Sequence, residues 1–465
     1  FALASLYAWT PFFWQQDRVG MLVPLLASVC PDPVLNIVLQ TGLTVFAGLC
    51  VPLLLVELIS PHPAARAAAT LASAAMITLA PDRIRDNLLY ECYYPLAMAL
   101  GCAGLLVLGR GPGWPRWWRV LVAAGLFGLA HWVYLGLPLW LGPLAVIRGW
   151  LQPGEPWPSS NWRATLRPLL HPRTVIACVL IVVTFAGGFE LMLWVQRTDP
   201  GVYMPTPREG LAPQEWADSW SGFAEHLFRL PGMTAWMITM LAAAVCGVLA
   251  AVVTRKPSFP IVAAAPVLLI PAAAEFLFIG TREWAATNDH HPRYLLGTVE
   301  SLQTLLALLA VFPLAGWADG RGRWVLGGLA ALALFASATS RYGFPSPERP
   351  RRDIEERAGT LTAELLAADV DAIGGDYWTV WPAVYHANMV RRDRIMYGVA
   401  DRGRVLLARW PRSPHQPLRV AVLNTPEQRQ WFLTYIPVCG LTTPVKIGEH
   451  GPFEIYLTYP ADAVP

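Results

Sequence analysis

The first stretch that could carry chemistry is WQQDRVGMLVPLL, in which Asp17 and Arg18 separate two apolar segments. The apolar segment after them has roughly 13 residues, too few to cross a bilayer, and suits a helix that lies in the membrane interface. Asp17 could cap that helix, because the positive end of a helix dipole favours an acidic group. It could also be a catalytic carboxylate at a membrane surface.

A second charged cluster lies in PDRIRDNLLYECYYPL, which leads into an apolar stretch. Its charged residues are Asp82, Arg83, Arg85, Asp86 and Glu91. They form either a solvated loop with tyrosines at the membrane interface or part of a site. Asp86 and Glu91 are too far out of helical register to share one face well.

A third cluster is TREWAATNDHHPRYLLGT, which contains Asp289, His290, His291, Arg293 and Tyr294. Adjacent histidines point in different directions and no HxxxH spacing occurs, so the pattern does not favour a metal site. An arginine offers a planar fork for two phosphate oxygens where lipid headgroups lie. The alternative is a structural one, in which the arginine and tyrosine only anchor a helix end.

The remaining candidates are less specific. Residues 196–231 contain PQEWADSWSGFAEHLFRL, which predicts an amphipathic helix on the membrane surface. Glu190, Glu275 and Glu300 fall near or within apolar segments, where a carboxylate is a functional candidate unless it reaches water.

Composition indicates a membrane protein. Of 465 residues, 55% are hydrophobic and 14% are charged, whereas about a quarter of a soluble chain is charged. The net charge is +3 and no basic block occurs, which excludes a nucleic-acid partner of the usual kind. The seven cysteines form no CxxC or Cys/His pattern and predict neither a disulfide framework nor a zinc site.

The apolar runs predict about eleven transmembrane helices in a polytopic all-α domain over residues 1–344. The expected spans are 1–14, 33–58, 64–80, 91–109, 117–131, 132–148, 174–195, 232–254, 259–280, 295–317 and 324–340. If the first span exits outward, the inner loops are rich in arginine and the outer loops are more acidic. All three charged clusters then lie on the outer side, as does the C-terminus.

Residues 345–465 are predicted to form a small α/β extracytoplasmic domain. A helical pattern begins in SPERPRRDIEERAGTLTAELLAAD, and short strand-like runs follow in VDAIGGDYW, RIMYGV, RVLLARW, LRVAVLN and FEIYLTY. TPEQRQWFLTYI predicts a helix with Thr425 as N-cap and Pro426 at its first position. The GGDYW stretch (374–378) is either a tight glycine turn with buried aromatic residues or an element that binds an acceptor or partner.

Together these features resemble the GT-C superfamily of integral-membrane glycosyltransferases, which use polyprenyl-phosphate-linked sugars on the outer side of the membrane. WQQDRVGMLVPLLA resembles the first outer loop of those enzymes, and DRIRDNLLYECYYPLAMALG resembles their acidic second outer loop. GLFGLAHWVYLGLPLWLGPLAVIR is similar to their paired short spans, and HPRYLL to a recurring entry into a late span. GGDYWTVWPAVYHANM is similar to part of the outer domains of some members.

The resemblance implies an enzyme that transfers a sugar from a polyprenyl-phosphate donor to a glycan, lipid or protein acceptor. Asp17 would be the general base, with Asp86 and Glu91 as further catalytic carboxylates. Arg293 and Tyr294, with Arg83 and Arg85 as alternatives, would bind the donor phosphate. Asp82 and His290 would bind the acceptor.

The resemblance further implies a multi-pass protein of a bacterial inner membrane, with the C-terminal domain outside. Many members carry an acidic pair at this position, whereas this chain has Asp17 followed by Arg18. A divalent ion, Mg²⁺ or Mn²⁺, therefore stays an open possibility as cofactor. Two other functions stay open. One is an O-antigen ligase or polymerase, which handles similar lipid-linked sugars; the other is a non-catalytic membrane scaffold or a transporter.

Overall fold

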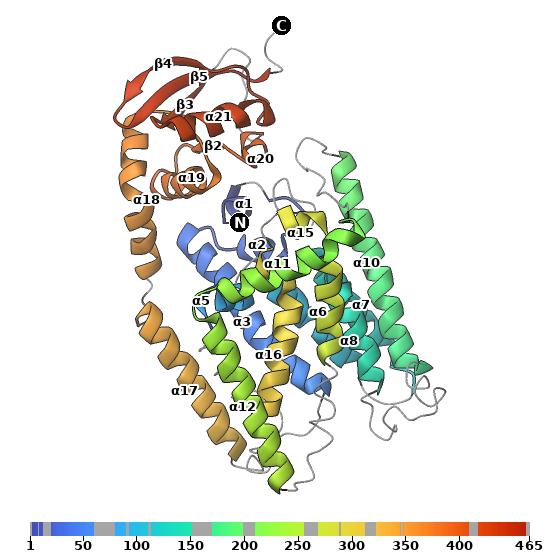
Figure 1. Ribbon diagram of the computed structural model, residues 1–465. Helices are drawn as coiled ribbons and strands as arrows, with labels where there is room; N and C mark the ends of the chain where they lie inside the picture. Colours follow the sequence, from blue (N-terminus) through green and yellow to red (C-terminus); the bar gives the residue numbers. More distant parts are fainter. Residues whose placement is uncertain are drawn as a thin grey trace.

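The computed structural model is mostly helical, with a five-stranded sheet near the C-terminus (Figure 1). It describes residues 2–7, 9–12, 20–59, 80–89, 93–109, 113–150, 170–198, 210–254, 268–287, 290–311, 322–344, 346, 348–408 and 417–461. The helices up to residue 342 form a bundle, and the sheet lies at one end of that bundle.

The bundle is held by helix crossings at which small residues let two backbones approach. Its helices are α1 (Ala2–Tyr7), α2 (Leu22–Ala27), α3 (Pro33–Ile59), α5 (Asp82–Leu89), α6 (Tyr94–Leu108), α7 (Trp117–Val133), α8 (Pro138–Trp150), α10 (Pro172–Thr198), α11 (Trp216–Arg229), α12 (Met233–Thr254), α14 (Leu269–Ile279), α15 (Glu283–Thr287), α16 (Leu296–Val311) and α17 (Gly322–Tyr342), with short 3₁₀ helices η2 (Pro213–Glu215) and η4 (Pro292–Leu295). The helix α6 packs against α3 and α7, and α16 packs against α12 and α14. A Cβ on Gly247 of α12 would lie 2.0 Å from the carbonyl oxygen of Leu309 on α16, so this crossing requires glycine.

Three of the described helices are long and apolar enough to cross a membrane: α3, α10 and the Met233–Ala250 part of α12. The helices α6, α7 and α14 are apolar but shorter. These helices support the membrane protein that the composition predicts. The expected total of about eleven spans stays a prediction.

The structure agrees with some of the predicted spans and differs from others. The paired segment is two helices, α7 and α8, with a turn at residues 134–137 between them, as expected. A single span over residues 1–14 is wrong, because α1 ends at Tyr7 and Phe12 pairs with Gly20. Pro11 disfavours helical backbone at Thr10, and its carbonyl accepts hydrogen bonds from Met21 N (3.1 Å) and Trp132 Nε1 (2.9 Å). The expected span 64–80 falls almost wholly outside the described residues.

The C-terminal part is a small α/β domain, as predicted. Its elements are α18 (Arg349–Ala367), β1 (Ala372–Gly374), α19 (Tyr377–Val390), β2 (Tyr397–Val399), α20 (Gly403–Leu407), β3 (Leu418–Leu423), α21 (Pro426–Val438), β4 (Val445–His450) and β5 (Phe453–Thr458). The sheet order is β2-β1-β3-β5-β4; β2, β1 and β3 are parallel, and β5 and β4 are antiparallel to their neighbours. The register shifts between Lys446 and Gly448 of β4.

Two elements of this domain differ from the predicted pattern. RVLLARW was expected to be a strand, but Gly403–Leu407 is the short helix α20, whose Val405, Leu406 and Leu407 are buried. The strand β4 was not predicted, because all six of its residues are exposed and show no alternation. The predicted helix after β3 is α21, with the Thr425 hydroxyl accepting from Gln428 N at 3.3 Å and Pro426 in the first turn.

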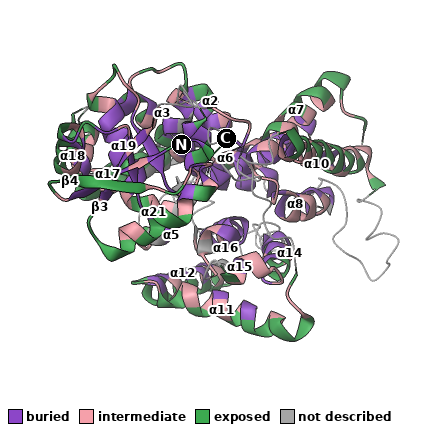
Figure 2. Ribbon diagram, turned by 90° about the horizontal axis from the view of Figure 1, so that it is seen from above, coloured by how far each residue is buried: buried purple, intermediate pink, exposed green. Residues whose placement is uncertain are grey.

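The C-terminal domain contacts the bundle at the first residues of α3. Tyr385 Oη donates to the Pro33 carbonyl at 2.6 Å, and the Asp32 carboxylate pairs with Arg351 (3.7 Å) and Arg392 (3.6 Å). Figure 1 places the domain at the same end of the bundle as α1, α2 and α15. Viewed from that end, Figure 2 shows buried residues concentrated in α3, α6 and α19, whereas α11 and α12 are largely exposed or half-buried.

Candidate functional site

The helix α5 and the 3₁₀ helix η4 lie in contact, although about 200 residues separate them in the chain. Asp82 begins α5, where the helix dipole favours a carboxylate. The η4 segment begins at Pro292, and the ring Nδ1 of His291 accepts a hydrogen bond from Arg293 N at 3.2 Å. The structure thus brings the described parts of the second and third charged clusters together.

Arg85 is the buried cation of this region. Its side chain is 7% exposed and pairs with Asp82 at 2.9 Å and with Asp86 at 3.8 Å. Asp82 also pairs with Arg341 near the end of α17. Two carboxylates compensate the charge of Arg85, so this arginine orients Asp82 and Asp86 and is the weaker candidate for a phosphate ligand.

Arg293 is oriented by its neighbour Tyr294. Its Nη2 donates to Tyr294 Oη at 2.9 Å, and its guanidinium carbon lies 4.9 Å from the tyrosine ring centroid. Tyr294 is buried and packs edge-on against Trp284, with 4.6 Å between ring centroids. The tyrosine therefore holds the guanidinium in one direction while Arg293 itself stays partly accessible.

His290 links this segment to α11. Its Nε2 lies 3.2 Å from the Ser219 hydroxyl oxygen, and its ring packs edge-on against Phe223 at 4.9 Å. A Cβ on Gly222 would lie 2.8 Å from His290 Cε1, so the glycine permits this approach. The amphipathic helix predicted within residues 196–231 is α11, but its contact with His290 was not predicted from the sequence.

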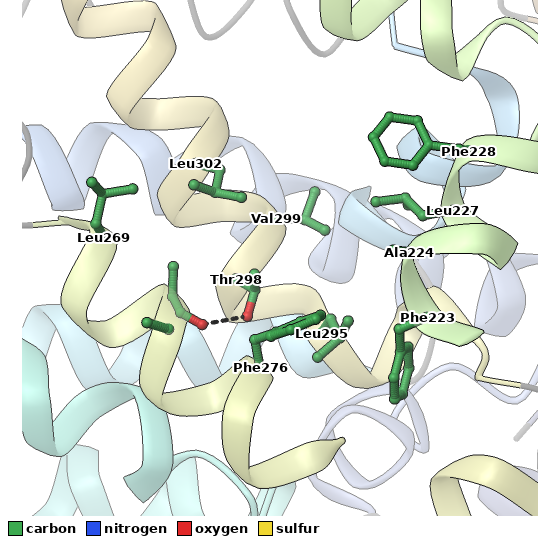
Figure 3. A pocket seen from close by; sticks show the side chains of 12 residues that line it. Phe223, Ala224, Leu227, Phe228, Leu269, Phe276, Leu295, Thr298, Val299 and Leu302 are labelled. Carbon is green, nitrogen blue, oxygen red and sulfur yellow. Dashed lines mark hydrogen bonds between the residues drawn. The ribbon is translucent and has the colours of Figure 1, made fainter. Parts of the chain in front are cut away.

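An apolar cavity of about 390 Å³ lies beside η4, between α11, α14 and α16 (Figure 3). It is lined by Phe223, Ala224, Leu227, Phe228, Leu269, Ala272, Ala273, Phe276, Leu295, Thr298, Val299 and Leu302. The Thr298 hydroxyl donates to the Ala272 carbonyl at 2.9 Å, so it adds no free polar group to the lining. Phe228 and Leu269 are about half exposed, which leaves one rim of the cavity open. Leu295 joins this apolar cavity directly to the Arg293–Tyr294 pair.

Two buried carboxylates lie near the cavity. Glu275 accepts hydrogen bonds from Thr298 N (2.5 Å) and Thr298 Oγ1 (2.9 Å) and thereby ties α14 to the start of α16. Glu300 is 1% exposed, and its Oε2 has no hydrogen-bond partner among the described residues. Glu275 is therefore a structural group, and Glu300 is not explained by the packing.

Several predicted site residues lie outside the described residues: Asp17, Glu91 and Asp289, together with the side chain of Arg83. The segments on either side of 13–19 are described. Phe12 pairs with Gly20, and Gly20 N donates to the Val133 carbonyl at 3.2 Å. Among the described residues, no group of three or more His, Cys, Asp or Glu side chains could hold a metal ion. Asp17 and Glu91 are not among these residues, so the possible Mg²⁺ or Mn²⁺ cofactor stays a prediction.

Comparison of the chain with protein-family models, with curated proteins and with solved structures found no match. The resemblance to membrane glycosyltransferases consequently stays a prediction from the sequence motifs. What the structure adds is the contact between α5 and η4, and an apolar cavity whose lining includes Leu295 of η4.

Proposed function

We propose that this protein is a GT-C-like membrane glycosyltransferase that moves a sugar from a polyprenyl-phosphate donor to an acceptor outside the cytoplasm. The observation that carries the proposal is that Arg293 and Leu295 belong to the same short helix, η4, and that Leu295 lines the apolar cavity. A lipid phosphate needs a cationic group next to an apolar channel, because the headgroup and the chain require opposite surroundings.

In the proposed complex, the Arg293 guanidinium binds the donor phosphate and the cavity between α11, α14 and α16 accepts the first part of the polyprenyl chain. The planar guanidinium presents two parallel donors to phosphate oxygens. Tyr294 positions that guanidinium through its hydroxyl, so little side-chain freedom is lost on binding.

The reaction would break the bond between the anomeric carbon and the phosphate oxygen, with the electron pair leaving on the polyprenyl phosphate. An acceptor hydroxyl oxygen attacks the anomeric carbon, and its proton passes to a carboxylate. Asp17 is the proposed base. Asp86 is the alternative, because it lies beside Arg85 on α5 with a side chain 30% exposed. Arg293 stabilises the charge that develops on the leaving phosphate.

The proposal includes about eleven spans in a bacterial inner membrane, with the C-terminal domain outside. It is supported by the arginine-rich inner loops and the acidic outer loops. In Figure 1 the C-terminal domain lies at the same end of the bundle as α15, which belongs to a predicted outer loop. An outside position of the domain is consistent with this arrangement.

The test is donor turnover by the purified, reconstituted protein, measured as polyprenyl phosphate released from a panel of polyprenyl-phosphate sugars. We expect release by the wild type, a loss of about 10²-fold or more in Asp17→Asn, and a loss of about 10-fold to 100-fold in Arg293→Ala. Trp114→Ala, which changes an exposed tryptophan outside the site, should retain activity. Turnover unchanged in Arg293→Ala would contradict the donor site, and no turnover with any donor would contradict the function.

An O-antigen ligase is the second candidate, because such enzymes depend on outer-loop arginine and histidine. His226 and His291 lie 6.4 Å apart between ring centroids, and His291 Nδ1 accepts a hydrogen bond from Arg293 N at 3.2 Å. If Asp17→Asn retained activity while His291→Ala abolished it, the ligase hypothesis would be favoured.

A further inference from the structure

The carboxyl ends of the three parallel strands in the C-terminal domain gather side chains that the proposed transfer does not use. The chain passes from β1 to β2 on one side and then to β3 on the other side of β1. In sheets of this kind the loops that leave neighbouring strands diverge, and ligands bind in the crevice between them. Figure 1 shows α18 and α20 on opposite sides of the domain, and α20 follows the carboxyl end of β2.

Asp376 and Gln428 fix the shape of this edge. Gln428 Oε1 accepts from Asp376 N at 2.9 Å, and Gln428 Nε2 donates to the Asp376 carboxylate. Asp376 also caps α19 by accepting from Trp378 N at 2.8 Å and Thr379 N at 3.2 Å. Gly375 has φ +149°, and a Cβ there would lie 2.2 Å from Gln428 Oε1. Gly375 of GGDYW is therefore required by this arrangement.

Neither aromatic residue of the motif is fully buried, since Tyr377 is half-buried and Trp378 is exposed. Trp378 is 82% exposed at the start of α19, in edge-on contact with Tyr377 at 5.0 Å. The Arg402 guanidinium lies 5.0 Å from the centroid of Tyr377, and Arg402 is itself held in the left-handed region at φ +67°. The interpretation of GGDYW as a turn with buried aromatic residues is thus right for the turn and wrong for the burial of its aromatic residues.

A second aromatic pair lies on α21, the helix that contains Gln428. Trp431 and Tyr435 of α21 are stacked, with 5.7 Å between centroids and 10° between ring planes, and Trp431 is 40% exposed. Burial raises the pKa of Tyr435, Asp401 and Asp376 raise it further, and Arg402 opposes them, so these charged groups lie near its phenol. Burial also raises the pKa of Asp376, but hydrogen bonds from Thr379, Gln428 and Trp378 outweigh it and hold that pKa below its usual value.

We propose that this carboxyl edge binds a carbohydrate chain through Trp378 and Trp431, with Asp376, Asp401 and Arg402 bonding its hydroxyl groups. An exposed indole presents a flat apolar face that matches the C–H face of a pyranose ring, and ionised side chains form strong hydrogen bonds to hydroxyl groups. A phosphorylated ligand is disfavoured, because the Asp376 carboxylate already occupies the amino end of α19. The role of this site rests on the proposed function: in a glycosyltransferase, the bound carbohydrate chain is the glycan acceptor.

The test is direct binding by the full-length protein in nanodiscs, measured by calorimetry with linear tetrasaccharides of glucose, galactose and mannose as probes. We expect at least one of them to bind the wild type, and Trp378→Ala to weaken that binding by about tenfold or more. Trp378→Ala should fold normally because the indole is exposed, and Trp114→Ala, also an exposed tryptophan, should bind as the wild type does. No binding of any tetrasaccharide to the wild type would overturn the proposal, as would equal binding by Trp378→Ala.

Donor release separates this inference from the proposed function. Tetrasaccharide binding that depends on Trp378, in a protein that releases no polyprenyl phosphate, would support the carbohydrate site and overturn the transferase. Donor release without tetrasaccharide binding would support the transferase and overturn the carbohydrate site.

Discussion

Nη2 of Arg293 donates to the hydroxyl of Tyr294, its neighbour in sequence, at 2.9 Å, and the guanidinium also lies against the tyrosine ring. Tyr294 is only 3% exposed and packs on Trp284, so it cannot follow Arg293 if the arginine moves. The direction of the Arg293 guanidinium is therefore set by the packing of a buried tyrosine.

Tyr294→Phe should raise the KM for the lipid donor by about threefold to tenfold, because one hydrogen bond of about 0.5–1.5 kcal/mol no longer positions Arg293. The ring and its packing are retained, so kcat should change less than KM. The measurement is initial rates of polyprenyl phosphate release over a range of donor concentrations. Tyr459→Phe, in the C-terminal domain, is the matched control and should leave KM unchanged. An unchanged KM in Tyr294→Phe would remove the positioning role.

Ala273→Trp should obstruct the apolar cavity, because Ala273 lines it and lies at its exposed side. We expect the KM for a long-chain polyprenyl donor to rise by about tenfold, with a much smaller change for a donor with a two-isoprene chain. The added indole takes space that only the longer chain occupies. Ala243→Trp adds the same bulk to an exposed position of α12 outside the cavity. Equal effects on both donors would show that the lipid chain lies elsewhere.

Asp32 should make the contact between the C-terminal domain and α3 sensitive to acid. The backbone N–H of Leu35 lowers the pKa of Asp32, burial opposes it, and Val34, Arg351 and Arg392 lower it further. A lowered folded-state pKa means that the stabilisation is present above the usual value of 3.8 and is lost as the pH falls below it. Asp32→Asn keeps the helix cap but removes the charge. Its thermal midpoint, measured between pH 7 and pH 3, should therefore fall less on acidification than that of the wild type.

The control for Asp32→Asn is Asp393→Asn, whose side chain is 75% exposed. This variant should retain the acid sensitivity of the wild type. Parallel pH curves for Asp32→Asn and the wild type would contradict the role of the charge.

Glu454 should stabilise the antiparallel strands β3, β5 and β4, and this stabilisation should depend on pH. It accepts from Arg429 Nε at 2.8 Å, Lys446 Nζ at 2.7 Å and Tyr456 Oη at 2.8 Å. The hydrogen bond from Arg429 is the largest influence, and these groups together lower the pKa of Glu454 to about 2. The stabilisation is therefore complete above the usual value of 4.5 and is lost as the pH falls from there toward 2.

Glu454→Gln should accelerate amide hydrogen exchange in β3, β4 and β5 at neutral pH, since the variant loses charge-assisted hydrogen bonds worth about 1.5–3 kcal/mol. The effect should shrink as the pH falls through about 2, where the wild-type carboxyl becomes protonated as well. Glu449→Gln is the control, because Glu449 is exposed and accepts only from Lys446 among the described residues. Equal protection of the sheet in Glu454→Gln and the wild type would contradict this account.

Local signals in the sequence predicted those parts of the fold that depend on neighbouring residues. Thr425 and Pro426 mark the start of α21 because capping and proline geometry act within one turn. The buried run Val405–Leu407 was misread as a strand, since a short apolar run has no periodicity that separates strand from helix. The exposed strand β4 was missed because it pairs with β5 without burying either face.

In the candidate site, too, only the features that depend on neighbouring residues could be predicted from the sequence. Arg293 and Tyr294 are adjacent, so their role as a pair could be expected from HPRYLL. The contact of Ser219 with His290 joins residues 71 positions apart, and no spacing rule reports it. The apolar cavity likewise needs α11, α14 and α16 together, and each helix alone shows only an apolar face.

The edge strand β4 affects how copies of this protein can pack next to one another in a membrane. β4 presents Lys446, Glu449 and His450 to solvent, and its register shift at Lys446–Gly448 interrupts the regular ladder. Charges and a bulge on an outer strand prevent it from adding a strand of another molecule. Where many copies lie side by side in one bilayer, β4 should therefore not pair with the sheet of a neighbouring copy.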